Sequence, residues 1–126
     1  QTVVPNRNMI MISVAASLAI KNKCEYLWYA AHAGDHEIYP DCRPEFIQKL
    51  GDVLSICDYH KIKFEAPFMN LSKKQIVAEG LKMNLDYKNA WTCYVGGEKP
   101  CLKCSACLER MSAFAENNTK DPLNEI

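Results

Sequence analysis

Four cysteines near the C-terminal end constrain the fold of this chain more than any other feature. Cys93, Cys101, Cys104 and Cys107 have the spacing C-x7-C-x2-C-x2-C, and a Gly-Gly pair and a proline lie in the longer gap. Four thiolates that converge from a turn-rich segment suit a tetrahedral zinc site with no open coordination position. We therefore expect the metal to stabilise a loop, and we expect any chemistry to lie elsewhere in the chain.

Disulfides, free buried thiols and an iron–sulfur cluster are the other interpretations of these cysteines. The gap of seven residues and the lack of a second cysteine set in the sequence favour zinc. A chain with seven cysteines, four of them in a metal-like spacing, is typical of a reducing compartment, so we expect a cytoplasmic location. Cys24 and Cys57 stand apart from the pattern and are expected to be packing residues.

The composition argues against several classes of protein. The 126 residues include 15 basic and 15 acidic side chains, so the formal net charge is zero. Because no positive field is available to hold phosphates, we expect no direct nucleic-acid partner, and a nucleic-acid-binding zinc knuckle is disfavoured. The most apolar stretch, 9–20, contains two serines. It is shorter than the roughly 20 residues that span a bilayer, so we expect no membrane partner.

Helical and strand-like segments alternate along the chain. Hydrophobic periodicity predicts helices at 9–21, 44–59, 73–83 and 105–117, and strands at 26–33 and 62–66, after a β-branched stretch at 2–4. Ser72 and Gln75 have the spacing of a capping box at the start of the third helix. This order predicts the α/β class with a largely parallel sheet. Because two or three strands are few for such a sheet, we expect the chain to be part of a larger domain.

Three polar segments are candidates for ligand binding. The segment 32–35, His-Ala-Gly-Asp, ends the main strand, where open α/β sheets bind ligands; the simpler interpretation is an ordinary turn. The loop 39–46, Tyr-Pro-Asp-Cys-Arg-Pro-Glu-Phe, presents charged side chains between two prolines, or only caps the next helix. The segment 4–8, Val-Pro-Asn-Arg-Asn, places an arginine at a helix start, where anions bind, although simple capping would use the same residues.

Together these segments resemble a known family, the 7-cyano-7-deazaguanine synthases of queuosine biosynthesis. The stretches V-P-N-R-N, H-A-G-D, Y-P-D-C-R-P-E-F, T-C-Y-x-G-G-E-K-P-C and C-x-x-C-x-x-C carry the resemblance, which covers 3–122. It implies an ATP-dependent ligase that converts 7-carboxy-7-deazaguanine and ammonia to the 7-cyano compound through an adenylated carboxylate. It also implies a partial Rossmann-like, adenine nucleotide alpha-hydrolase-like fold. Residues 1–90 would then form the C-terminal part of the nucleotide-binding domain, and 91–126 the zinc loop and terminal helix.

The same resemblance assigns site residues, cofactors and partners. The residues that match its substrate cleft are Arg7, His32 and Asp35 as catalytic residues and Asn8, Asp41 and Arg43 as substrate-binding residues. Arg7 would balance charge on phosphate, and His32 would orient ammonia or move a proton. Asp35 or Asp41 would accept hydrogen bonds from the guanine-like edge. The four cysteines would bind a structural zinc, ATP would act with Mg²⁺, and the protein would be a homodimer that acts on small molecules.

One departure from the family pattern is large. The S-G-G-x-D-S phosphate loop of the family does not occur in this sequence. Without that loop the chain has no cradle for the pyrophosphate of ATP, so we expect it to be inactive alone and to act as a part of the ligase. The alternative is a non-catalytic, zinc-stabilised binding module related to the family.

Overall fold

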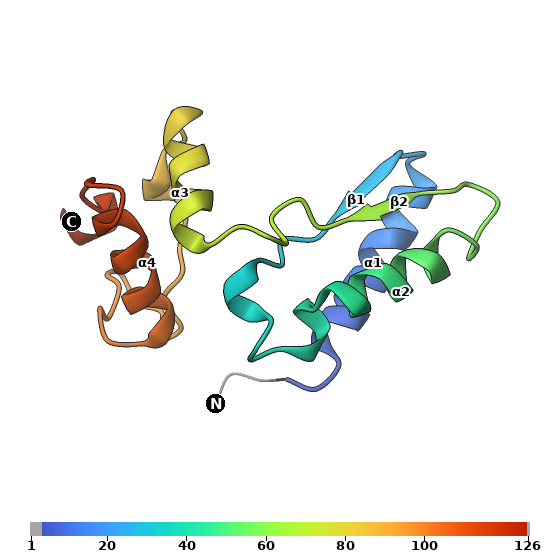
Figure 1. The fold of residues 1–126 in the computed structure, drawn as a ribbon, viewed down its shortest axis with the longest axis horizontal. Helices are drawn as coiled ribbons and strands as arrows, with labels where there is room; N and C mark the ends of the chain where they lie inside the picture. The colour runs from blue at the N-terminus through green and yellow to red at the C-terminus, as the bar shows by residue number, and fades with distance from the viewer. Residues whose placement is uncertain (1–3, 126) are drawn as a thin grey trace. The chain divides into compact units, whose positions relative to one another are not determined.

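The computed structural model describes residues 4–125, which form two compact units, one ending at Asn70 and the other beginning at Leu71 (Figure 1). Most of the β-branched stretch expected at 2–4 lies outside the described residues. The sequence placed the division between residues 90 and 91, where the cysteine loop begins. The contacts instead group α3 (Lys73–Lys82) with α4 (Ser105–Ala115), because these two helices share a core.

Two helices form most of the first unit. Helix α1 (Arg7–Lys21) begins two residues earlier than expected, after Asn6, whose φ of 59° is left-handed and whose side chain makes no capping hydrogen bond. Helix α2 (Pro44–Leu54) begins at a proline, whose fixed φ suits the first helical position. It ends at Leu54 rather than near residue 59, and the Ser55 hydroxyl donates a hydrogen bond to the carbonyl of Asp52 at this end.

Two short parallel strands pack with these helices (Figure 1). Strand β1 (Tyr26–Trp28) pairs with β2 (Lys63–Glu65) in the register Tyr26↔Lys63, Leu27↔Phe64 and Trp28↔Glu65. The amide of Tyr29 still donates to the carbonyl of Glu65, but the chain then leaves the sheet, so the strand expected over 26–33 was predicted too long. The α/β class with parallel pairing is confirmed. The Rossmann-like arrangement stays a prediction, because the described residues hold two strands.

The core of the first unit has two parts. The larger part lies between α1, α2 and the strands, and its buried members are Ile12, Ala16, Ala19, Leu50, Leu54 and Ile62. The smaller part consists of Ala31, Cys42 and Ile47. It anchors the segment 33–43, which contains two 3-10 turns, η1 (Ala33–Asp35) and η2 (Pro40–Cys42). This smaller core therefore fixes the two polar loops that the sequence singled out.

The second unit is built on α3 and α4, and the cysteine loop leads into the start of α4. Ser72 accepts a hydrogen bond from the amide of Gln75, and the Gln75 side chain accepts one from the amide of Ser72, which confirms the capping box. Val77, Phe114 and Tyr87 lie in the core, where the two aromatic rings meet edge to face at 5.1 Å. Two 3-10 turns, η3 (Tyr87–Asn89) and η4 (Pro122–Glu125), complete the unit. Within residues 4–125, every helix is too short or too polar to cross a bilayer.

Candidate functional site

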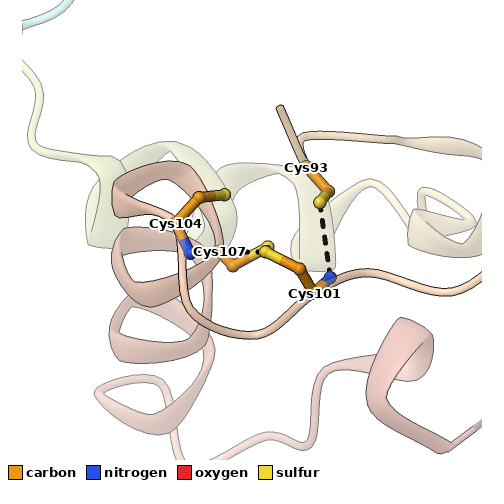
Figure 2. Close-up of side chains that lie close together, drawn as sticks. All are labelled: Cys93, Cys101, Cys104 and Cys107. Atoms are coloured by element: carbon orange, nitrogen blue, oxygen red, sulfur yellow. Dashed lines mark hydrogen bonds between the residues drawn. The ribbon is translucent and has the colours of Figure 1, made fainter. Parts of the chain in front are cut away.

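The four predicted cysteines converge in the second unit. Their sulfur atoms all lie within 4.8 Å of one another, and Figure 2 shows the four side chains directed toward a common centre. All four are free thiols, and the Sγ atoms of Cys101 and Cys107 are 4.0 Å apart, far beyond the roughly 2.05 Å of a disulfide. Four sulfurs at about 2.3 Å from one tetrahedral zinc would be about 3.8 Å apart. The cluster therefore fits a divalent metal such as zinc.

The loop conformation explains how these sulfurs meet. Gly96 and Gly97 have φ of 75° and 94°, which confirms that the Gly pair makes the turn between the first and second cysteine. Leu102, inside the next C-x-x-C step, has a φ of 57°. The amides of Lys103 and Cys104 then point at the Cys101 sulfur, at 3.5 and 3.4 Å.

The backbone also adjusts the acidity of these thiols. The amide of Cys101 lies 3.3 Å from the sulfur of Cys93 and lowers the pKa of that thiol. Hydrogen bonds from the amides of Tyr94 and Cys107 lower the pKa of Cys104 to about 6. Burial has the opposite effect on Cys107 and raises its pKa to about 12. A bound divalent cation would displace the remaining protons, since metal binding to thiols releases them.

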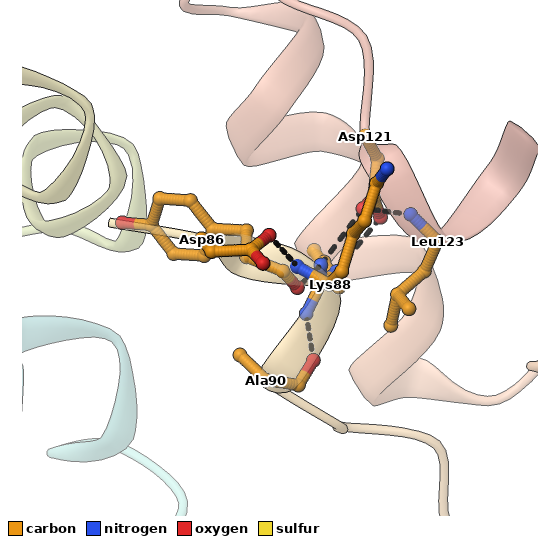
Figure 3. A network of polar contacts seen from close by, with 7 residues as sticks. Asp86, Lys88, Ala90, Asp121 and Leu123 are labelled. Atoms are coloured by element: carbon orange, nitrogen blue, oxygen red, sulfur yellow. Dashed lines mark hydrogen bonds and ion pairs between the residues drawn. The ribbon is translucent and has the colours of Figure 1, made fainter. Parts of the chain in front are cut away.

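A buried ion pair supports α4, the helix that carries Cys107 and begins directly after Cys104. Arg110 of α4 donates two hydrogen bonds to the carboxylate of Asp121, and further ones to the backbone carbonyls of Tyr87 and Ala90. The same carboxylate accepts a hydrogen bond from the amide of Leu123, as Figure 3 shows. The pair therefore joins α4 to η3 and to the C-terminal turn.

In the first unit, the turn at 32–35 forms a compact polar pair. His32 is buried, its Nδ1 accepts a hydrogen bond from the amide of Gly34, and its Nε2 lies 3.3 Å from Oδ2 of Asp35. Because Nδ1 is an acceptor, Nε2 carries the proton and donates to the carboxylate. The Asp35 side chain is 28% exposed, so it can meet a ligand from solvent while the imidazole behind it fixes its orientation.

A second polar pair joins the start of α1 to η2. The amide Nδ2 of Asn8 donates to Oδ2 of Asp41 at 2.9 Å, and both side chains are half-buried. Arg7 donates to the other end of the same amide, with Nε and Nη2 each 3.3 Å from Oδ1 of Asn8. Arg7, Asn8 and Asp41 thus form one connected polar row.

Tyr29 and Cys42 adjoin the second pair. The Tyr29 hydroxyl is 3.3 Å from the Cys42 sulfur, and that sulfur is 3.9 Å from Oδ1 of Asp41. Burial raises the pKa of both groups, and the negative charges of Asp35 and Asp41 raise them further. Tyr29 and Cys42 are thus connected to the Asn8–Asp41 pair through the Cys42 sulfur, and the charge of Asp35 acts on the same two groups.

Arg43 completes the predicted set. Its Nε donates to the carbonyl of His36 at 2.9 Å, which ties the end of the loop 33–43 to its middle. Arg43 also lines a hollow of about 340 Å³ beside Met9 and Phe46, a size typical of small-molecule sites. Five of the six predicted residues therefore belong to the two hydrogen-bonded groups, and the sixth lies at the adjoining hollow.

Sequence reasoning did not single out Tyr29, Cys42, Arg110 or Asp121. Cys42 lay within the motif 39–46, but its burial beneath the loop follows from tertiary packing. Tyr29 appeared as a strand residue. No local pattern links Arg110 to Asp121. The reverse error concerns Cys24 and Cys57, which were predicted to pack in the core and are exposed.

Fold and site together define an α/β chain that carries a cluster of four cysteines able to bind a metal ion and, in its first unit, a group of acidic, amide and basic side chains suited to a polar small molecule. The model of the family described as queuosine biosynthesis protein QueC matches residues 1–118. The chain belongs to this family.

Individual relatives give the same result. The chain is 52% identical to 7-cyano-7-deazaguanine synthase 1 of Colwellia psychrerythraea over 122 residues, which are 97% of this chain and 56% of the relative. It is 53% identical to the 7-cyano-7-deazaguanine synthase of Marinobacter nauticus, over 97% of this chain and 55% of the relative. It is 50% identical to the synthase of Caldicellulosiruptor saccharolyticus, over 98% of this chain and 55% of the relative. The chain thus spans about half the length of the curated relatives it matches.

Proposed function

We propose that this chain is the part of an ATP-dependent 7-cyano-7-deazaguanine synthase that holds the deazaguanine acid and carries a structural zinc. The observation that supports this most is its identity of 52% over 97% of the chain to a relative named for that activity. The hydrogen-bonded row of Arg7, Asn8 and Asp41 next to Cys42 supports it as well.

The proposed reaction sets clear demands on the protein. Conversion of a carboxylate and ammonia to a nitrile removes both carboxylate oxygens, and neither is a good leaving group. Transfer of AMP from ATP to the carboxylate releases pyrophosphate and turns one oxygen into part of a leaving group; ammonia then attacks the carbonyl carbon, and AMP departs with that oxygen to leave the amide. Adenylation of the amide oxygen by a second ATP, followed by loss of AMP and the two amide protons, removes the second oxygen and gives the nitrile. The chain must therefore bind the deazaguanine ring in one orientation and stabilise negative charge next to its carboxylate.

We assign the recognition of the ring to the carboxylates. The amino and imino groups of a guanine-like edge are paired donors, and a carboxylate accepts two such hydrogen bonds. Asp35 and Asp41 are both reachable from solvent and both fixed from behind, by His32 and Asn8. In this proposal His32 acts mainly through Asp35, since both of its ring nitrogens are engaged.

We assign the stabilisation of negative charge on the phosphate to the two arginines. Arg7 is exposed at the first residue of α1, where the helix N-terminus adds a partial positive charge. Arg43 is exposed and lines the hollow. Either guanidinium could balance charge on the α-phosphate or the substrate carboxylate, and ATP would bring Mg²⁺ with it.

The metal would have a structural role. Cys93, Cys101, Cys104 and Cys107 would hold zinc with all four positions filled, which leaves none for substrate. The ion would fix the loop onto the start of α4. On the strength of the resemblance we further propose a cytoplasmic homodimer without a direct nucleic-acid partner. Light scattering of the purified protein tests its oligomeric state.

One set of titrations tests the function. We expect this chain to bind 7-carboxy-7-deazaguanine by calorimetry and not to bind ATP measurably, since its sequence lacks the phosphate loop. The full-length protein should convert the acid, ATP and ammonia to the nitrile. Absence of nitrile from the full-length protein would contradict the enzyme proposal, and retained binding of the acid would then favour the non-catalytic module.

A further inference from the structure

Cys42 is placed unusually for a buried cysteine. It is 5% exposed and packs with Ala31 and Ile47, yet its sulfur also faces two polar groups. The hydroxyl of Tyr29 lies 3.3 Å away on one side, and Oδ1 of Asp41 lies 3.9 Å away on the other. A cysteine that served only to fill space would have no need of either polar neighbour.

The protonation of the thiol follows from these surroundings. A thiol held in an apolar pocket and subject to the negative charges of Asp35 and Asp41 is disfavoured as a thiolate, and the pKa of Cys42 is raised, first by burial. The neutral thiol can donate its S–H to Oδ1 of Asp41 while it accepts the O–H of Tyr29. Donors then approach both oxygens of the carboxylate, the thiol at Oδ1 and the Asn8 amide at Oδ2.

Tyr29 is itself fixed. Its ring stacks on Phe64 of β2 with centroids 6.1 Å apart, and its amide is bonded to the carbonyl of Glu65. The sheet therefore fixes the position of the Tyr29 hydroxyl. That hydroxyl holds the Cys42 thiol in place, and the thiol limits the rotamers of the Asp41 carboxylate. Asp41 is only half-buried, so without such support its side chain would sample several rotamers.

We infer that Cys42 is a positioning residue for the deazaguanine acid: its thiol, supported by Tyr29, holds the Asp41 carboxylate in the orientation that binds the ring. This inference rests on the proposed function. It assigns Cys42 no covalent step, since no bond to its sulfur forms or breaks.

Substitutions at Cys42 separate positioning from packing. Cys42→Ser keeps a donor and acceptor of similar shape, whereas Cys42→Ala keeps only part of the apolar volume. If the thiol positions Asp41, the Ala variant of the full-length protein should bind 7-carboxy-7-deazaguanine about threefold to tenfold more weakly, the effect of one hydrogen bond. The Ser variant should stay within about twofold of the wild type. The KM for ATP should not change in either variant.

Two further variants keep the test decisive. Tyr29→Phe retains the stacked ring and removes only the hydroxyl, so it should weaken binding in the same direction even where Cys42→Ala does not fold. Cys24→Ala, at an exposed cysteine, is the matched control and should bind as the wild type does. Wild-type binding by Cys42→Ala, or equal weakening by the Ser and Ala variants, would overturn the inference. Failure of the wild type to bind the acid would instead contradict the proposed function.

Discussion

Arg110 and Asp121 form a two-point ion pair in which Nε lies 2.7 Å from Oδ2 and Nη2 lies 2.8 Å from Oδ1. Their side chains are 7% and 3% exposed, so both charges are buried. The guanidinium also lies over the ring of Phe114, 5.2 Å from its centroid, and Figure 3 shows the polar contacts around Asp121. The pair is a structural connection within the second unit, between α4 and the two segments that flank it.

Removal of one partner of this pair should strongly destabilise the second unit. Asp121→Ala leaves a buried guanidinium without its counter-ion, a change that costs about 3–5 kcal/mol in proteins. Urea unfolding followed by the fluorescence of Trp91, in a Trp28→Phe background, measures the effect. Glu79→Ala removes the exposed Lys82–Glu79 pair and serves as control, with an expected loss below about 1 kcal/mol. Equal effects of the two substitutions would contradict the assignment.

Two helical glycines should respond in opposite ways to substitution by alanine. A Cβ added at Gly80 would collide with the Tyr87 hydroxyl and lie 2.8 Å from its ring carbon Cζ, and that hydroxyl is bonded to the carbonyl of Val77. Gly80→Ala should therefore destabilise the second unit by about 1–3 kcal/mol, despite the better helix propensity of alanine.

Gly51 provides the matched control for this comparison. A Cβ at Gly51 would make ordinary contacts at 3.7 Å or more, so Gly51→Ala should stabilise the first unit by roughly 0.5–1 kcal/mol. Thermal unfolding of both variants checks the signs. A stabilised Gly80→Ala variant would mean that Tyr87 moves aside without loss.

The elements that the sequence predicted well are those fixed by local chemistry. The capping box at Ser72, the start of α2 at Pro44 and the turn at Gly96 depend on residues a few positions apart, and the structure contains all three. The cysteine cluster was predictable for a similar reason, since its spacing brings the sulfurs together within one loop and one helix start.

The features that the sequence did not reveal depend on distant residues. The apolar run after Tyr26 looks like one long strand, but from Ala31 onward it packs under the loop 33–43 instead of pairing. The contacts of Tyr29 with Cys42 and of Arg110 with Asp121 join segments that no periodicity relates. The roles of the motif residues in catalysis and substrate binding stay predictions, because geometry alone does not assign them.

The stability of the first unit should fall at alkaline pH through Cys42. Its pKa is raised above the ordinary 9.0 by burial, so the folded state favours the neutral thiol. This contribution is fully present below about pH 9 and is lost as the pH rises through the folded-state pKa. The difference in unfolding free energy between the wild type and the non-titrating Cys42→Ser variant should therefore shift against the wild type as the pH rises above about 9. A difference that stays constant with pH would contradict burial of the thiol.

Loss of one metal ligand should abolish binding of the ion and loosen the second unit specifically. Cys107 is 2% exposed and contributes a sulfur to the centre of the cluster. Cys107→Ser should eliminate the one equivalent of zinc expected from elemental analysis of the wild type, and Cys57→Ser should retain it, because Cys57 lies outside the cluster. Hydrogen exchange should rise in the cysteine loop and at the start of α4, and α1 should keep its protection, since a metal bound by the four cysteines would close only the loop of the second unit. A strong chelator should reproduce this pattern in the wild type. Full protection of the loop after chelation would show that the fold of the second unit does not depend on the metal.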